Sequence, residues 1–418
     1  MLEKLTGIHV RWECALEVEF DKRKREWLKH FTVPDILCAD VSEVGEGDGT
    51  CWNLMTDEEA QLPEDLAVYS FGYSCKDLST LNNMSSEWRS ECVVTGRGST
   101  GKTWLGNMGI LRKCKPMLII MENVPSARRG ANHAKMVSDL AAAGYRLFDV
   151  EANSADYGLP QDRRRAWFVA ILDGLCLLQS NADFQCLMDT LKLDDHLPLA
   201  RFLLPPGHSY LKALLEIKKK LIMKREQAKA RRGKATLVRG KAPAKAKPKV
   251  RAGNKWKSDH WMVRRVLGMP APSSDLPDAF ADVVRDNAMC DRESDLFRVI
   301  CDGPAKPDPD EQPCVELKHS APRVVGLTGS SKRRRRIGST SCLLPTSKLM
   351  LLPPLVPQPR YLTGLEALGI QGVDAAFCST DAKLTDSEYM HLAGNAFSGA
   401  CFAAAFISAM SSMDVSKL

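Results

Sequence analysis

The chain has 418 residues, which allows two or three domains of ordinary size. Its content of 44% hydrophobic and 26% charged residues excludes global disorder, a collagen-like fibre and a bundle of transmembrane helices. The formal net charge of +7 is unevenly distributed, because residues 218–257 contain 17 Lys and Arg and a single acid, Glu226. That segment carries +16 and the remaining chain −9. This asymmetry predicts either an anionic partner, usually nucleic acid, or a solvated disordered insertion.

The cysteines and apolar stretches exclude further classes. None of the 14 cysteines forms a Cys-x-x-Cys pair, so zinc-ribbon and zinc-finger spacings are absent. No secretory signal is visible, and scattered cysteines without one are typical of reduced thiols in the cytosol or nucleus. The apolar stretch at residues 396–410 is too short and too rich in small residues for a good membrane span. We therefore expect a buried terminal helix and no membrane association.

Strand-like and helix-like segments alternate through the first 175 residues. This alternation predicts a mostly parallel, doubly wound α/β sheet, in which ligands bind at the carboxyl ends of the strands. The expected strands are residues 11–19, 35–41, 67–71, 117–121 and 166–172, and the expected helices are residues 20–30 and 133–143.

The pattern changes after this alternating region. A helical stretch leads into the low-complexity basic run, and a Pro- and Asp-rich region with a second basic cluster at 332–336 follows. Ordinary globular composition returns after a Pro-rich linker at 353–359. We therefore expect one domain assembled from residues 1–175 and 357–418, with residues 176–356 inserted between its two parts.

Residues 96–103 read GRGSTGKT and match the phosphate-binding pattern Gly-x4-Gly-Lys-[Ser/Thr]. A nearby apolar strand that ends in Glu122 resembles the metal-binding strand that accompanies such loops. A phosphate loop should follow a solid strand, however, and only the short stretch 92–94 precedes this one. Two interpretations remain open: an NTPase, and a mobile Gly-rich loop that binds no nucleotide.

Four further groups of residues are informative through their order. GYSC at 72–75 and ENV at 122–124 each follow an expected strand. QDRRR at 161–165 precedes a third strand, and GNA at 394–396 opens the last expected helix. Each group alone is weak, because a Cys after a strand is usually a small buried residue and an Arg run is usually solvated. Their order and spacing together carry the signal.

In this order the groups resemble the motifs of the C5-cytosine DNA methyltransferases. The resemblance covers about residues 1–172 and 357–410, and the stretch from ENV to QxRxR is its most specific part. It includes the acidic motifs EFD at 19–21 and DV at 40–41, and RYLTGLE at 360–366. It implies a Rossmann-like S-adenosylmethionine-dependent methyltransferase sheet with an inserted, irregular target-recognition region. The GRGSTGKT segment then falls in the mobile loop after the nucleophile.

The resemblance implies a reaction in which a cytosine is flipped out of duplex DNA and methylated at C5. Cys75 would add to C6 as a thiolate, which makes C5 an electron-rich enamine carbon. Glu122 would contact N3 and offset the negative charge that develops on the ring. Arg165, with Arg163 beside it, would hold the O2 edge with fixed donors.

S-adenosylmethionine would be the methyl donor. Residues of the acidic motifs would take its ribose hydroxyls, adenine face and adenine amino group, and the last helix would close the pocket. The implied cofactor residues are Glu19, Phe20, Asp40 with Val41, Asn395 and Phe397.

The sequence departs from the family in two places. The first Gly-rich loop and the strand before it are absent, which predicts an incomplete cofactor site and a missing central strand. Ser74-Cys75-Lys76 also stands in place of Pro-Cys-Gln. Loss of the proline frees the turn that aims the thiol. Lys76 either lowers the pKa of the Cys75 thiol or points to solvent.

Other functions remain open at this level. The missing loop motivates a DNA-binding relic without catalysis, and a related branch of the family methylates transfer RNA. The basic run favours DNA over RNA. The cluster at 332–336 predicts nuclear import, with an exposed loop in a cytoplasmic protein as the alternative. Trp256 and Trp261 either stack on bases or pack in a core.

Overall fold

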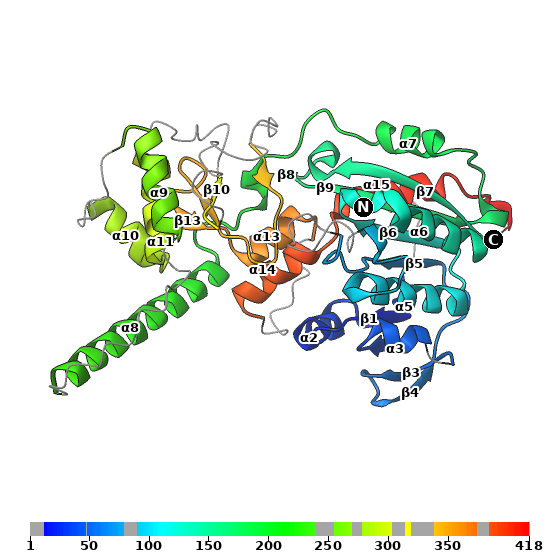
Figure 1. The fold of residues 1–418 in the computed structure, drawn as a ribbon, viewed down its shortest axis with the longest axis horizontal. Coiled ribbons are helices and arrows are strands. Elements are labelled where there is room, and N and C mark those ends of the chain that lie inside the picture. Colours follow the sequence, from blue (N-terminus) through cyan, green and yellow to red (C-terminus); the bar gives the residue numbers. More distant parts are fainter. Residues whose placement is uncertain are drawn as a thin grey trace.

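The computed structural model describes residues 12–46, 48–78, 90–238, 255–269, 278–302, 314–318, 338–373 and 384–417. These residues form two lobes: a sheet lobe on the right of Figure 1 and a second lobe on the left. The basic cluster at 332–336 and the part of the basic run from 239 to 254 lie outside the described residues.

A four-stranded sheet in the order β5-β6-β9-β7 forms the centre of the sheet lobe. β5 (Val68–Phe71) and β6 (Leu118–Asn123) are parallel. β9 (Arg164–Leu172) lies antiparallel between β6 and β7 (Tyr145–Asn153). Every residue of β6 is buried, as expected for a strand covered on both faces.

β7 is a strand that the sequence analysis missed. Its core-facing residues Phe148, Val150 and Ala152 alternate with Asp149 and Glu151, which is the period-two pattern of a strand. β9 was expected, but not its antiparallel direction. The reason is that β7 and β9 are joined by only a short connection, whereas a parallel pair requires a crossover of a dozen or more residues.

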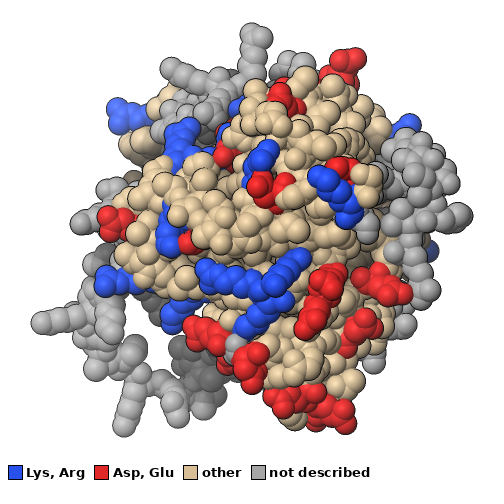
Figure 2. Space-filling view, turned by 90° about the vertical axis from the view of Figure 1, so that its right-hand side faces the viewer, with Lys and Arg blue, Asp and Glu red and all other residues tan. Residues whose placement is uncertain are grey.

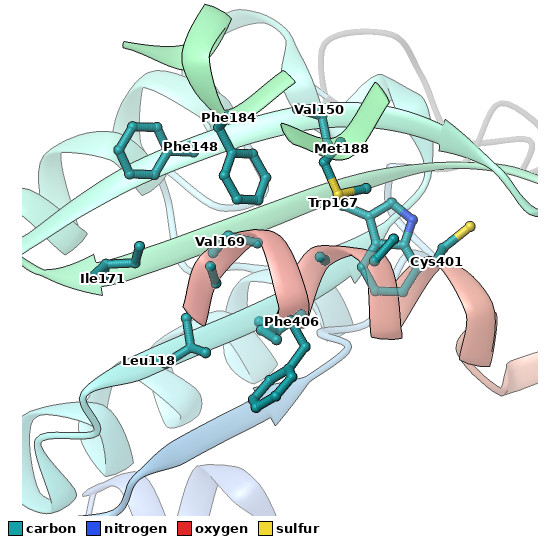
Figure 3. Close-up of a cluster of buried hydrophobic side chains, with 14 of the residues drawn as sticks. Leu118, Phe148, Val150, Trp167, Val169, Ile171, Phe184, Met188, Cys401 and Phe406 are labelled. Atoms are coloured by element: carbon teal, nitrogen blue, oxygen red, sulfur yellow. The ribbon is translucent and has the colours of Figure 1, made fainter. Parts of the chain in front are cut away.

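One face of the sheet is covered by α15 (Gly399–Met410) and α7 (Asn181–Thr190). Trp167 of β9 and Phe406 of α15 lie in this core (Figure 3). The segment Asp386–Met410 is long and apolar enough to qualify as a membrane span by composition, but its second half fills this core. The expected buried terminal helix is therefore confirmed.

The opposite face packs against α5 (Gly98–Cys114) and α6 (Gly130–Ala142). Trp104 of α5 and Met136 of α6 are completely buried there. Successive residues of β6 alternate between the two cores, as the pleat of a strand requires. The sheet is thus held between two helical layers, and its strand ends are left to form the site.

A separate parallel pair, β1 (Leu16–Val18) and β2 (Ile36–Cys38), lies beside the main sheet. α3 (Val41–Glu46) follows β2 and fixes the pair to α5 through close glycine contacts. A Cβ on Gly45 would lie 2.2 Å from the carbonyl oxygen of Gly106. No ladder joins β1 to β5 within the described residues.

The second lobe has a core of its own. Strands β10 (Cys314–Glu316), β12 (Leu349–Leu351) and β13 (Arg360–Tyr361) form an antiparallel sheet. α9 (Lys255–Val266) and α11 (Asp291–Asp302) pack against it. The region that was expected to be irregular therefore contains a small α/β unit, built on strands of two or three residues.

α8 (Ser209–Val238) projects away from the second lobe and carries much of the basic run (Figure 1). Lys219 and Lys220 of this helix are exposed. Trp261 of α9 is 57% exposed, so core packing is the wrong interpretation for that side chain, whereas Trp256 is half-buried.

β3 and β4 form an antiparallel hairpin at the bottom of the sheet lobe, and Asp57, Glu58 and Glu59 are exposed on it. Figure 2 shows acidic side chains gathered on the lower part of this lobe. The remaining elements are α2 (Lys22–Phe31), β3 (Thr50–Asn53), β4 (Glu58–Gln61), β8 (Gln161–Asp162), α10 (Asp278–Asp286), β11 (Thr340–Ser341), α13 (Gly364–Ile370) and α14 (Asp386–Asn395).

Candidate active site

A cleft of about 2850 Å³ opens where β1, β2, β5 and β6 end. All the site residues expected from the sequence line it: Glu19, Phe20, Asp40, Val41, Cys75, Glu122, Arg163, Arg165, Asn395 and Phe397. Its volume exceeds the roughly 300–1,000 Å³ of a typical small-molecule site, so it has room for more than one ligand. The carboxyl ends of the strands are where open α/β sheets bind ligands.

Cys75 lies in the loop after β5 and is exposed at the cleft. The surrounding walls withdraw solvent from its sulfur, which raises the pKa of the Cys75 thiol, and the Glu122 carboxylate raises it further. Arg165 and Arg163 act in the opposite direction. The net result is a raised pKa of the Cys75 thiol. Of the two alternatives for Lys76, the one in which it gives Cys75 a lowered pKa is therefore not supported.

Glu122, near the end of β6, is a buried carboxylate that faces two guanidinium groups. Its Oε1 lies 2.9 Å from Arg165 Nε and 3.5 Å from Arg163 Nη2. Because a buried charge is costly unless it is paired, these contacts hold the carboxylate in place beside the thiol.

Arg163 has a bracing position behind this pair. It is only 3% exposed, and its guanidinium donates to the carbonyl oxygens of Ala396 at 2.9 Å, Leu343 at 3.2 Å and Gly394 at 3.4 Å. These bonds tie the start of β9 to two segments from the far end of the chain. Arg165 is the more exposed of the two arginine side chains. That Arg165 contacts O2 of the cytosine remains a prediction.

Two carboxylates follow the adjacent parallel strands β1 and β2. Glu19 Oε1 accepts from the Asp21 N–H at 2.8 Å, and Asp40 Oδ1 accepts from the Ser42 N–H at 2.8 Å. Phe20 is 79% exposed and offers an aromatic face at the same end of the cleft. The two carboxylates can accept hydrogen bonds from hydroxyl and amino groups, and the exposed Phe20 ring can stack on a base. These groups fit the adenosine part of S-adenosylmethionine.

Asn395, the last residue of α14, and Phe397, in the segment between α14 and α15, both line the cleft. Phe397 packs edge-on against Trp167, with ring centroids 5.8 Å apart. A Cβ on Gly72 would lie 3.1 Å from the Phe397 ring, so a small residue at that position favours this approach. The Asn395 side chain donates to the carbonyl oxygen of His391 at 3.0 Å.

The wall of the cleft between β1 and β5 is lined by apolar side chains. Leu16 and Val18 of β1, Val68 of β5, and Phe406 and Met410 of α15 all line this part of the cleft. Residues of β1 are half-buried rather than buried.

Residues 96–103 lead into the first turns of α5 and do not form a phosphate loop. No strand precedes them within residues 90–95. The Asp77 carboxylate occupies the helix start, where its Oδ2 accepts from the Thr100 N–H at 2.8 Å. A Cβ on Gly98 would lie 2.5 Å from the same oxygen. A carboxylate at this position repels a phosphate, so the segment offers no phosphate site for an NTPase. Residues from Gly98 onward are helical, so the expected mobile loop is not found there either.

Cys342 is a residue of the cleft that the sequence analysis did not identify. Cys342 lies between β11 and β12, and its sulfur is 3.4 Å from Arg165 Nη2. It belongs to no motif and is separated from Arg165 by 177 residues. Only the folded chain could place it beside the arginine.

Comparison with known proteins gives a family match over most of the chain. The family model described as C-5 cytosine-specific DNA methylase matches residues 46–404. DNA (cytosine-5-)-methyltransferase DMT5 of Cryptococcus neoformans var. grubii is 26% identical over 165 residues, 39% of this chain and 6% of that protein. Type II methyltransferase M.Sau3AI of Staphylococcus aureus is 30% identical over 120 residues, 27% of each chain.

The chain spans less than half of the length of these curated relatives. Among solved structures, the Dnmt2 methyltransferase of S. pombe superposes with a TM-score of 0.49 at 11% identity, over 98% of this chain and 92% of that one. The Entamoeba histolytica methyltransferase EhMeth gives a TM-score of 0.46 at 12% identity, over 94% and 88%. S-adenosylmethionine is the methyl donor of the matched family. With residues of most of its motifs lining one cleft and a family match that spans residues 46–404, this chain belongs to the C-5 cytosine-specific DNA methylase family.

Proposed function

We propose that this chain transfers a methyl group from S-adenosylmethionine to C5 of a cytosine in DNA. The observation that carries the proposal is the meeting of Cys75, Glu122 and Arg165 in one cleft, with Glu122 Oε1 2.9 Å from Arg165 Nε. They supply a nucleophile, an acid and a fixed guanidinium, which are the three groups that activate a cytosine ring in the proposed reaction.

The chemistry proceeds through a covalent adduct. The Cys75 thiolate forms a bond to C6, and the ring electrons move to C5. This step requires Glu122 in its carboxylic acid form, whose O–H donates to N3 and offsets the negative charge that develops on the ring. Bound S-adenosylmethionine supplies an electrophilic methyl group on a sulfonium. When C5 takes that methyl, the bond between the methyl and the cofactor sulfur breaks and the sulfonium leaves as a neutral thioether. C5 then loses its proton to a base, and the bond between C6 and the Cys75 sulfur breaks to restore the aromatic ring and the thiolate.

Cys75 must lose its proton before it can attack. Its raised pKa means that the resting thiol is mostly protonated at neutral pH. Arg165 lowers the cost of forming the anion, because its guanidinium favours the thiolate that Glu122 disfavours. The Glu122 carboxylate therefore favours the unreactive thiol form of Cys75, while the Arg165 guanidinium keeps the thiolate accessible.

The cofactor site is assigned to the other end of the cleft. Glu19 would take the ribose hydroxyls, Phe20 the adenine face, and Asp40, with Val41 beside it, the adenine amino group. Asn395 and Phe397 would close the pocket. Calorimetry with S-adenosylmethionine tests this assignment. We expect micromolar binding that Glu19→Ala weakens, and the absence of heat from the wild-type chain would contradict it.

The substrate is proposed to be duplex DNA with the target cytosine flipped into the cleft. The basic α8 and the basic run support an anionic polymer as the substrate, and the basic cluster at 332–336 supports nuclear location. Transfer of labelled methyl groups to duplex DNA and to transfer RNA, side by side, tests the choice. Label in RNA alone would contradict the DNA assignment. DNA retention without any transfer would favour a binding protein that has lost catalysis.

A further inference from the structure

The hydroxyl groups of the GRGSTGKT segment meet the loop that carries Cys75. Ser74, the residue before the nucleophile, donates its N–H to Thr103 Oγ1 at 3.0 Å. The hydroxyls of Ser99 and Ser74 are also hydrogen-bonded, at 2.8 Å. Both partners lie on the first turns of α5, so the loop and the helix start are joined side by side.

A reciprocal pair of bonds holds the other side of the loop. The Asp77 N–H donates to Thr100 Oγ1 at 3.1 Å, and the Thr100 N–H donates to Asp77 Oδ2 at 2.8 Å. Asp77 is buried, so water competes little for these bonds. The residue before Cys75 and the second residue after it are therefore both fixed to the same helix end.

The Thr103 hydroxyl is oriented for this contact. It donates to the carbonyl oxygen of Ser99, one helical turn earlier, at 2.8 Å. Its own hydrogen is thereby used, and a lone pair is left for the Ser74 N–H. A proline at position 74 has no N–H and could not make this bond. Loss of the proline therefore does not free the turn as expected, because hydrogen bonds constrain it.

We propose that Ser99, Thr100 and Thr103 are positioning residues that hold the Cys75 loop for attack on the base. The segment that matches a phosphate loop then has a different use, since its hydroxyls bind the nucleophile loop rather than a nucleotide. This inference rests on the proposed methyl transfer, but it concerns the geometry of the loop and can be measured separately.

The first test compares Thr103→Val with Thr103→Ser. Valine keeps the shape of the side chain and removes the acceptor, whereas serine keeps the acceptor. Because a small misplacement of a reacting group costs up to about 100-fold in rate, we expect Thr103→Val to lower kcat roughly 10- to 100-fold. The KM for DNA should change little, and Thr103→Ser should retain most of the wild-type kcat. An equal loss in both variants, or none in either, would overturn the proposal.

A second readout does not depend on methyl transfer. Alkylation of Cys75 by iodoacetamide is followed by peptide mass spectrometry, with the exposed Cys186 of α7 as an internal reference. We expect the Cys75-to-Cys186 rate ratio to rise several-fold in Thr103→Val. Thr95→Val is the matched control, because the Thr95 hydroxyl binds only the carbonyl oxygen of Glu91 among the described contacts.

The two readouts separate the two proposals. A raised alkylation ratio in a chain that transfers no methyl group would support the positioning role of these hydroxyls and contradict the proposed function. An unchanged ratio in a folded Thr103→Val protein would overturn the positioning role, whatever the activity of that protein. If Thr103→Val does not fold, Ser99→Ala removes the hydroxyl contact to Ser74 and serves as the second variant, judged by the same ratio.

Discussion

The guanidinium of Arg163 donates to the carbonyl oxygen of Ala396 at 2.9 Å, across 233 residues of sequence. This bond joins the QxRxR motif to the segment that leads into the last helix. Arg163 also contacts Glu122, so one buried side chain connects the end of β6 to the segment that leads into α15. Its main contribution is to the assembly of the cleft from the two ends of the chain.

We therefore expect Arg163→Ala to destabilise the fold. Removing one partner of a buried charged network costs about 3–5 kcal/mol, because the remaining groups stay buried without their donors. Urea unfolding followed by circular dichroism measures this change. The matched control is Arg164→Ala, whose exposed side chain lies 3.8 Å from Glu151 and should contribute less than about 1 kcal/mol. Similar midpoints for the two variants would contradict the bracing role.

Cys75 is expected to form a covalent bond to the substrate. In DNA that carries 5-fluorocytosine, C5 has no proton to lose after methylation, so the bond from C6 to sulfur should persist. We expect a protein–DNA adduct on a denaturing gel that requires S-adenosylmethionine and is absent in Cys75→Ser. Cys186→Ser, at an exposed position outside the cleft lining, should give the wild-type amount. An adduct that survives Cys75→Ser would assign the nucleophile to another residue.

The pH dependence of methyl transfer follows from the raised pKa of Cys75. The thiolate is the reactive form, and its ordinary pKa is about 8.5, so a raised pKa leaves a small thiolate fraction at neutral pH. The single-turnover rate should therefore climb by about tenfold per pH unit through the neutral range, without a plateau near pH 8. A rate that is flat above neutral pH would mean a lowered thiol pKa.

Replacing the charged neighbours of Cys75 should shift this thiol in opposite directions. Glu122→Gln removes a negative charge that raises the pKa of Cys75, so that pKa should fall. Arg165→Gln removes a positive charge that lowers it, so the pKa should rise. The pH dependence of Cys75 alkylation in each variant measures the shift without any need for activity. Shifts of the same sign would show that a structural change, and not charge, dominates.

The sequence was sufficient to predict which residues line the site. Its motifs lie at or directly after the ends of strands. The carboxyl ends of the parallel pairs β1–β2 and β5–β6 open on the same cleft, which brings Glu19, Asp40, Cys75 and Glu122 together. Contacts between segments far apart in the sequence could not be predicted from these motifs. Cys342 beside Arg165 and Ala396 beside Arg163 depend on how the second lobe returns the chain to the sheet.

Local pattern also misled at two points. The glycines and lysine at 96–103 satisfy a phosphate-loop pattern, but the pattern does not contain Asp77, whose carboxylate occupies the helix start. β9 has the composition of a buried strand in either direction, and only the short connection from β7 decides that it runs antiparallel. In both cases the deciding residue or length lies outside the pattern itself.

The projecting helix α8 offers a test of how the chain contacts DNA. Lys219, Lys220 and Lys224 are exposed on it, and each phosphate contact contributes about 0.9 to the slope of log affinity against log salt. If these lysines bind phosphates, replacing all three by Gln should reduce the slope by about 2–3, which filter binding at several salt concentrations measures. Lys192→Gln, which removes an exposed lysine paired with Asp189, should leave the slope unchanged. An unchanged slope in the triple variant would make α8 a solvated arm, the alternative that its composition left open, and would assign DNA retention to the cleft itself.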